Sequence, residues 1–163
     1  MIHIQKLEEG HYSAVGHYDR PGDPPSGLPL EAFFTFRRAP DEFEFDGFYH
    51  HHVGAPRHDF SLSFVLPPDT LGFGRFEYSD SVFRFLEGTV AWAEDAFLLA
   101  AHSADPVGSV TVYVHPQQPL GRFLIRGLVS IVNRRPVSFA ALMGPHDPKL
   151  AKAQVVGLRR PRT

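Results

Sequence analysis

Large apolar side chains recur at every second position in six segments of this chain, with mostly polar residues between them. Phenylalanine supplies many of these side chains, since the chain contains 15 Phe but only 5 Tyr and 1 Trp. Positions i and i+2 of a β-strand lie on the same face, so each segment would present one apolar face. The pattern predicts a mainly antiparallel all-β protein. The segments span residues 32–36, 43–45, 60–66, 76–78, 83–85 and 110–114.

Turn-forming residues separate these segments. The 163 residues include 14 Gly and 15 Pro, which is more than an average domain of this size contains. The longest break is the Pro- and Gly-rich stretch over residues 20–27, which we interpret as a surface loop. Short elements joined by frequent turns predict a β-barrel or β-sandwich with one or two short helices, folded as a single domain over residues 1–163.

Two segments fit either a helix or strands. Residues 89–102 are alanine-rich and fit equally well one helix or a hairpin that turns at residues 94–95. Residues 120–135 place apolar side chains at a helical spacing, but they are also rich in β-branched residues and contain Gly127. We interpret residues 120–135 as a strand, with a helix as the alternative.

Charge is distributed unevenly along the chain. Residues 1–120 contain 7 Lys and Arg against 17 Asp and Glu, whereas residues 121–163 contain 9 basic residues and one acid, Asp147. This asymmetry favours pairing of the acidic and basic segments, within one chain or between the copies of a homo-oligomer. Nucleic acid and a membrane surface are disfavoured as partners, because the net charge is −2 and no aromatic and basic motif of RNA-binding domains occurs.

The two ends of the chain carry weaker signals. In the basic C-terminal segment, residues 144–163, Asp147 and Pro148 could begin a short helix that ends at Gly157, followed by a frayed tail. A strand over residues 154–159 is the alternative. The N-terminus has no apolar stretch of signal-peptide length, so we expect a cytoplasmic protein. The absence of cysteine excludes disulfides and thiolate chemistry.

Three consecutive histidines are the sharpest chemical signal. On a strand spanning residues 43–53, His50 and His52 would share a face, with Cα atoms about 6–7 Å apart. Beyond the following turn, His58 or Asp59 could supply a third ligand for a divalent metal such as zinc or iron. This spacing predicts a metal-dependent enzyme in which the ion activates water or substrate.

The same histidines have two other interpretations. They could form a pH-sensitive or ligand-contacting patch, or they could be ordinary polar surface. His51 would point to the opposite face from its two neighbours, and no acidic residue follows within residues 53–57 to act as a further metal ligand. The sequence leaves all three interpretations open.

Adjacent aromatic residues bear on ligand binding. Phe33 precedes Phe34, and Phe48 precedes Tyr49, so rings would lie on both faces of their strands. The second aromatic face must be covered by the fold, a ligand or a partner, and burial within the fold is the interpretation we favour.

A Phe-lined barrel could also hold a small apolar or amphipathic molecule, with residues 20–29 as a lid. The ligand-contacting residues would then be Phe48, Tyr49, His50 and His52. We therefore expect a ligand-binding β-barrel. A metal-dependent enzyme and a self-associating interaction module are the alternatives.

Overall fold

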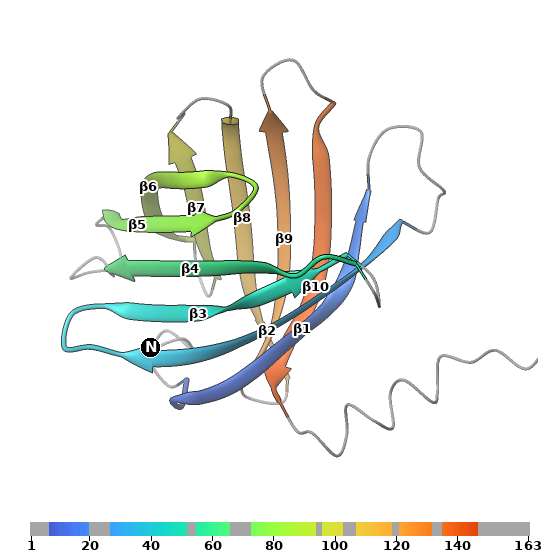
Figure 1. The fold of residues 1–163 in the computed structure, drawn as a ribbon. Helices are drawn as coiled ribbons and strands as arrows, with labels where there is room; N and C mark the ends of the chain where they lie inside the picture. Colours follow the sequence, from blue (N-terminus) through green and yellow to red (C-terminus); the bar gives the residue numbers. More distant parts are fainter. Residues whose placement is uncertain are drawn as a thin grey trace, which may run out of the picture.

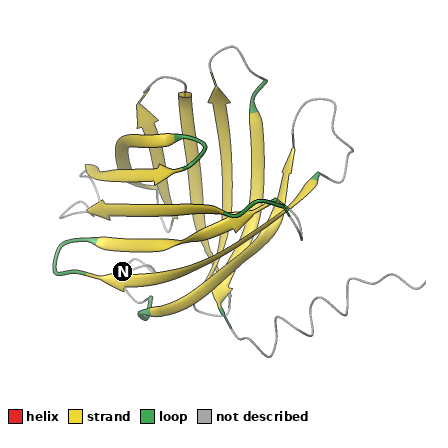
Figure 2. Cartoon of the chain, viewed as in Figure 1, coloured by secondary structure: helices red, strands yellow, loops and turns green. Residues whose placement is uncertain are grey.

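The computed structural model describes residues 7–19, 27–51, 55–65, 73–93, 96–102, 107–118, 121–131 and 135–146. These residues contain strands and loops but no helix (Figure 2), and therefore no helix that could cross a membrane. The strands are β1 (Gly10–Asp19), β2 (Leu28–Arg38), β3 (Phe43–His50), β4 (His58–Val65), β5 (Phe73–Asp80), β6 (Arg84–Ala93), β7 (Ala96–His102), β8 (Val107–Gln117), β9 (Arg122–Ile131) and β10 (Val137–Pro145).

The ten strands form a closed antiparallel barrel. Each strand pairs with its neighbours in the sequence, and β1 pairs with β10 to close the sheet. In Figure 1, β2 to β5 cross in front of β7 to β10. The predicted all-β fold is confirmed, in its barrel form. The helix predicted between residues 147 and 157 lies outside the described residues.

The alternation in the sequence sets which side of each strand faces the interior. Phe36 lies opposite Phe45, and Phe45 lies opposite Leu62, so these side chains share the inner face of three adjacent strands. A shift of one residue would turn the whole apolar set outward, which strongly disfavours any other register. The side chain of Phe36 is 0% exposed and that of Phe64 is 1% exposed.

Phenylalanine rings fill one end of the barrel, which we call the Phe36 end. The ring centroids of Phe36 and Phe43 are 5.8 Å apart, and those of Phe43 and Phe64 are 5.4 Å apart. Phe64 in turn contacts Phe97 at 5.6 Å, which joins β4 to β7 across the interior. Aromatic pairs at these separations stabilise a core beyond the area that they bury, by about 0.5–1.5 kcal/mol each.

Residues 7–9 cover the Phe36 end. The side chain of Leu7 is buried against the rings, and its carbonyl oxygen accepts a hydrogen bond of 3.0 Å from Arg38 Nη2. The hydroxyl of Tyr12 donates to the carbonyl oxygen of Glu8 at 2.7 Å. Burial, with a smaller contribution from the charge of Glu8, raises the pKa of Tyr12, so its hydroxyl remains a donor. This segment closes the barrel at one end.

The structure settles the two ambiguous segments. Residues 89–102 contribute to β6 and β7, which pair with Trp92 opposite Phe97, so the hairpin interpretation is correct and the helix is wrong. Within residues 120–135, β9 lies between β8 and β10, and the strand interpretation is confirmed. The alanine-rich composition of residues 89–102 does not distinguish a helix from a hairpin, because the strands form through pairing with their neighbours in the sheet.

Two sequence expectations were wrong in detail. Phe83 belongs to the turn before β6, and Phe85 points outward and is exposed, so they do not form one apolar strand face. The inner face of β6 is formed by Leu86 and Val90 instead. The strand expected over residues 43–53 ends at His50.

A glycine permits a close approach between β2 and β3. A Cβ atom on Gly47 would lie 2.1 Å from the carbonyl oxygen of Phe33, which is closer than real Cβ contacts allow. Gly47 occupies an inward position between Phe45 and Tyr49, so the missing side chain lets the two backbones approach where the sheet bends.

The charge asymmetry of the sequence becomes a difference between two sides of the barrel. Outward acidic residues lie on β2 to β6: Glu31, Glu44, Asp46, Asp59, Glu77 and Glu87. The described positions of β7 to β10 contain no acidic residue, while β9 carries the exposed Arg122 and Arg126. On this acid-free side Leu128 is 52% exposed and Leu142 is 47% exposed.

Candidate functional site

The interior is not filled evenly. Toward the end opposite the Phe36 end, which we call the Tyr49 end, several inward side chains are only partly buried. They are Ala32, Phe60, Leu62, Tyr78, Val110, Val112 and Ile125. Leu86 and Val129 are buried there. Inward side chains with partial exposure adjoin space that is open to solvent, so the inner surface along β2, β4, β5, β8 and β9 is accessible toward this end.

Aromatic and imidazole rings surround this space at the Tyr49 end, and we call them the aromatic belt. The ring of Tyr18 lies 4.6 Å from that of His51, and Tyr49 lies 5.1 Å from His58, measured between centroids. His51 and His58 are 5.6 Å apart. The belt continues through Phe60, which lies 6.3 Å from Tyr49 and stacks on Tyr78 at 6.1 Å.

One carboxylate joins two tyrosines of the belt. Asp80 Oδ2 accepts hydrogen bonds from the hydroxyls of Tyr49, at 2.9 Å, and Tyr78, at 2.6 Å. Burial is the main cause that raises the pKa of both tyrosines, and the charge of Asp80 raises them further. The two phenols therefore stay protonated and donate to Asp80 at neutral pH.

The backbone explains why Asp80 is held in place. Its second oxygen, Oδ1, accepts hydrogen bonds from the backbone N–H groups of Val82, at 2.8 Å, and Phe83, at 2.5 Å. This is the turn-closing role for which a short acidic side chain is favoured. Arg84 follows with a φ of 62°, the left-handed conformation that glycine adopts more easily. Asp80 thus shapes the β5–β6 hairpin and positions two belt tyrosines.

The predicted ligand-contacting residues are divided between the two faces of β3. Tyr49 faces inward and belongs to the belt, whereas Phe48 and His50 face outward. His50 Nε2 lies 3.1 Å from Glu31 Oε2 on the neighbouring strand. His52 lies outside the described residues.

The predicted metal ligands do not converge among the described residues. His58 faces inward, and its Nδ1 lies 2.9 Å from Ser81 Oγ. Asp59 faces outward with its side chain 73% exposed, and it pairs with Arg57 at 2.6 Å. No group of three potential metal-ligating side chains occurs in the part of the chain that the structure describes. Metal binding through His50 and His52 stays a prediction, because His52 is not described.

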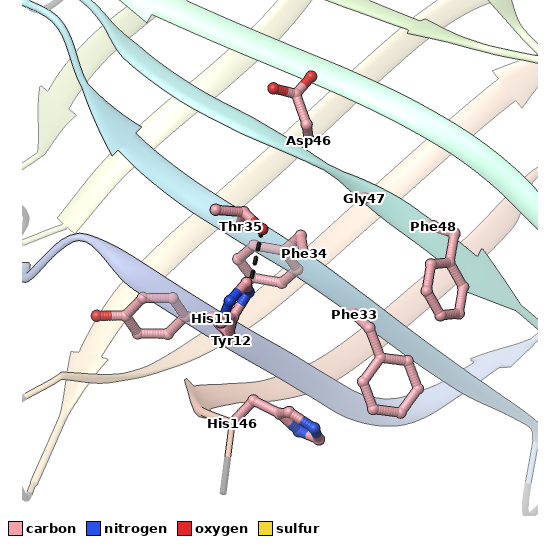
Figure 3. A pocket seen from close by; sticks show the side chains of 9 residues that line it. All are labelled: His11, Tyr12, Phe33, Phe34, Thr35, Asp46, Gly47, Phe48 and His146. Atoms are coloured by element: carbon pink, nitrogen blue, oxygen red, sulfur yellow. Dashed lines mark hydrogen bonds between the residues drawn. The ribbon is translucent and has the colours of Figure 1, made fainter. Parts of the chain in front are cut away.

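Phe48 lines a separate pocket on the outer surface of β1, β2 and β3, with a volume of about 350 Å³ (Figure 3). The rings of Phe33 and Phe48 lie 5.4 Å apart, and His146 meets Phe33 edge-on at 5.2 Å. His11 Nδ1 lies 3.1 Å from Thr35 Oγ1 at the same pocket. The outward rings that the sequence predicted on β2 and β3 thus cover one another in part.

Sequence reasoning did not name Tyr18, Phe60 or Tyr78 of the belt as ligand-contacting residues, nor Asp80, to which two belt tyrosines donate. Tyr78 was assigned only to a strand, and Asp80 was given no role in a site. The available signal was their spacing, because residues two apart at the end of a strand share a face. Their nearness to Tyr49 depends on register, which no local pattern contains.

Comparison with models of known protein families and with curated protein sequences finds no match to this chain. The function proposed below is therefore inferred from the geometry of the barrel. Two places gather chemically useful side chains, the aromatic belt inside and the pocket outside. The belt adjoins interior space and the outer pocket lies on the surface, so the interior is the stronger candidate for enclosing a molecule.

Proposed function

We propose that this protein binds a small apolar or amphipathic molecule inside the Tyr49 end of the barrel. The partial exposure of inward side chains is the observation that carries the proposal. Leu62, Val112 and Ile125 all point inward and remain partly accessible, whereas the rings at the Phe36 end are sealed. A ligand in this space would bury apolar surface that the empty barrel leaves accessible, which favours binding.

The belt would supply orientation. An apolar body would lie against Leu62, Val112 and Ile125, and a polar group would lie near the hydroxyls and imidazoles of the belt. The Nδ1 atom of His58 contacts Ser81, so its Nε2 atom is the ring nitrogen placed to meet a ligand. Few polar groups beside a mostly apolar lining are typical of small-molecule sites in proteins.

Filling the space tests this proposal directly. Val112→Trp adds a large side chain to the interior, whereas Thr111→Trp adds the same side chain to the outer face of the same strand. Binding of a hydrophobic fluorescent dye should be lost in Val112→Trp and kept in Thr111→Trp. Native mass spectrometry of the wild-type protein should also detect a copurified apolar ligand.

Thermal unfolding separates a filled site from a damaged fold. Because the proposed site leaves room beside Val112, Val112→Trp should be destabilised by less than the roughly 1–3 kcal/mol typical of overpacked cores. Dye binding by Val112→Trp at the wild-type level would contradict the proposal. So would a wild-type protein that releases no ligand and binds no dye.

A further inference from the structure

Building on the proposed function, we propose that the interior site takes a short amphiphile whose head group is neutral or cationic, and that it rejects anionic head groups. Among the described inward positions the one carboxylate is Asp80, at the end of β5, where it accepts hydrogen bonds from Tyr49 and Tyr78. The two arginines at these positions are Arg38, which lies at the Phe36 end against Phe43, and the exposed Arg84, which pairs with Asp80 in the register of β5 and β6. A carboxylate or phosphate ligand beside the belt tyrosines would therefore lie next to the charge of Asp80, while the one described inward arginine at that rim is exposed to solvent.

Asp80 lies beside the place where a head group would rest. Its carboxylate contacts Tyr49 and Tyr78, which are both belt residues. Two like charges about 6 Å apart in a protein site of effective dielectric constant near 20 repel enough to weaken binding by roughly a hundredfold. A cationic head group at the same place gains attraction of the same order, and a neutral one is unaffected.

The rings of the belt favour the same class of ligand. Tyr18, Tyr49, Phe60 and Tyr78 place four aromatic rings around one end of the space. An ammonium group over the face of such a ring is attracted by the ring electrons, whereas an anion is repelled by them. The hydroxyl oxygens of Tyr49 and Tyr78, which donate to Asp80, can also accept a hydrogen bond from a neutral alcohol or amine.

The depth of the space limits the length of the ligand. Buried Phe45 forms the floor on β3, four residues from Tyr49, and buried Phe34 on β2 lies opposite Gly47, two residues from Tyr49. The space therefore extends at most about 13 Å along β3, which a chain of about eight carbons would fill. A long fatty acyl chain would not fit without displacing the phenylalanine core.

A matched series of eight-carbon probes tests the head group with the full-length protein. 1-Octanol and octylamine should displace a bound hydrophobic dye. Octanoate should displace it only at a concentration at least tenfold higher. Asp80→Asn should narrow the difference between the concentrations of octylamine and octanoate that displace the dye. Phe48→Ala, which alters a residue of the outer pocket, should leave this difference unchanged.

The possible results separate the two proposals. If the dye binds and octanoate displaces it as well as octylamine does, the head-group inference is overturned while ligand binding stands. If neither the dye nor any probe binds, the interior function itself is wrong, and the head-group inference falls with it. The comparison of three probes on the wild-type protein does not depend on whether Asp80→Asn folds.

Discussion

The bond between Tyr78 and Asp80 yields the most quantitative prediction from this structure. Tyr78→Phe removes one hydrogen bond of 2.6 Å to a charged acceptor and leaves the ring stacked on Phe60. Bonds to charged groups contribute about 1.5–3 kcal/mol to stability. Asp80 keeps its bonds from Tyr49 and the backbone, so no acceptor oxygen becomes wholly unsatisfied. We therefore expect a loss near the lower limit, about 1.5–2 kcal/mol.

Urea unfolding followed by circular dichroism measures this loss. In a chain of 163 residues it corresponds to a decrease of roughly 3–8 °C in the melting temperature. Tyr113→Phe is the matched control, because Tyr113 is an exposed tyrosine on the outer face and should change stability by less than about 0.5 kcal/mol.

A double-mutant cycle identifies the partner. Asp80→Asn keeps the shape of the side chain but removes its charge, so Tyr78→Phe should cost about 1 kcal/mol less in the Asp80→Asn background than in the wild type. Equal costs in the two backgrounds would show that Tyr78 and Asp80 are not coupled. A cost below 0.5 kcal/mol in the wild type would refute the structural role of the bond.

Four further predictions concern other parts of the molecule. Arg84→Gly should raise the free energy of unfolding by about 0.5–1 kcal/mol, because glycine relieves the left-handed φ of 62° at some cost in the entropy of the unfolded chain. Urea unfolding measures this change, and a lower free energy of unfolding in Arg84→Gly would contradict backbone strain at this position. Because folding raises the pKa values of Tyr49 and Tyr78, their protonated hydroxyls contribute their full stability below pH 10. The free energy of unfolding should fall as the pH rises above 10, and it should fall less steeply in Tyr49→Phe. Elemental analysis of untagged protein should find stoichiometric zinc or iron if His50 and His52 bind a metal, and double alanine substitution should remove it; protein that binds none at micromolar levels ends that hypothesis. Sedimentation should show self-association that weakens with salt, and a salt-independent monomer would contradict it.

The fold was predictable because its signal is local. Alternation such as Phe34 and Phe36 on β2 depends only on residues two apart, and it survives into the structure as an inward face. The alternation failed at Phe83 and Phe85, because a turn anchored by Asp80 interrupts the period there. A residue that accepts hydrogen bonds from the backbone can override the pattern of its neighbours.

The candidate site was predictable only in part, because its contacts join distant strands. Tyr49 was among the predicted ligand-contacting residues, but its partner Asp80 is 31 residues away in the sequence. Their contact depends on the register of β3, β4 and β5 together. Phe48 and His50 were grouped with Tyr49 by adjacency, although the alternation of a strand places them on the opposite face.

The charge asymmetry acquires a spatial meaning from the topology. In a closed barrel whose strands pair in sequence order, position along the chain becomes position around the barrel. The acidic first part of the sequence therefore supplies the outer acids of β2 to β6, and the later part supplies the acid-free side with Arg122 and Arg126 on β9. Copies that associate through these charges would join unlike faces, since the same face on two copies carries the same sign. Contacts between opposite sides of the barrel are head-to-tail and close into a ring or continue as an open chain, whereas a two-fold symmetric dimer requires a contact patch that spans the boundary between the acidic and acid-free sides.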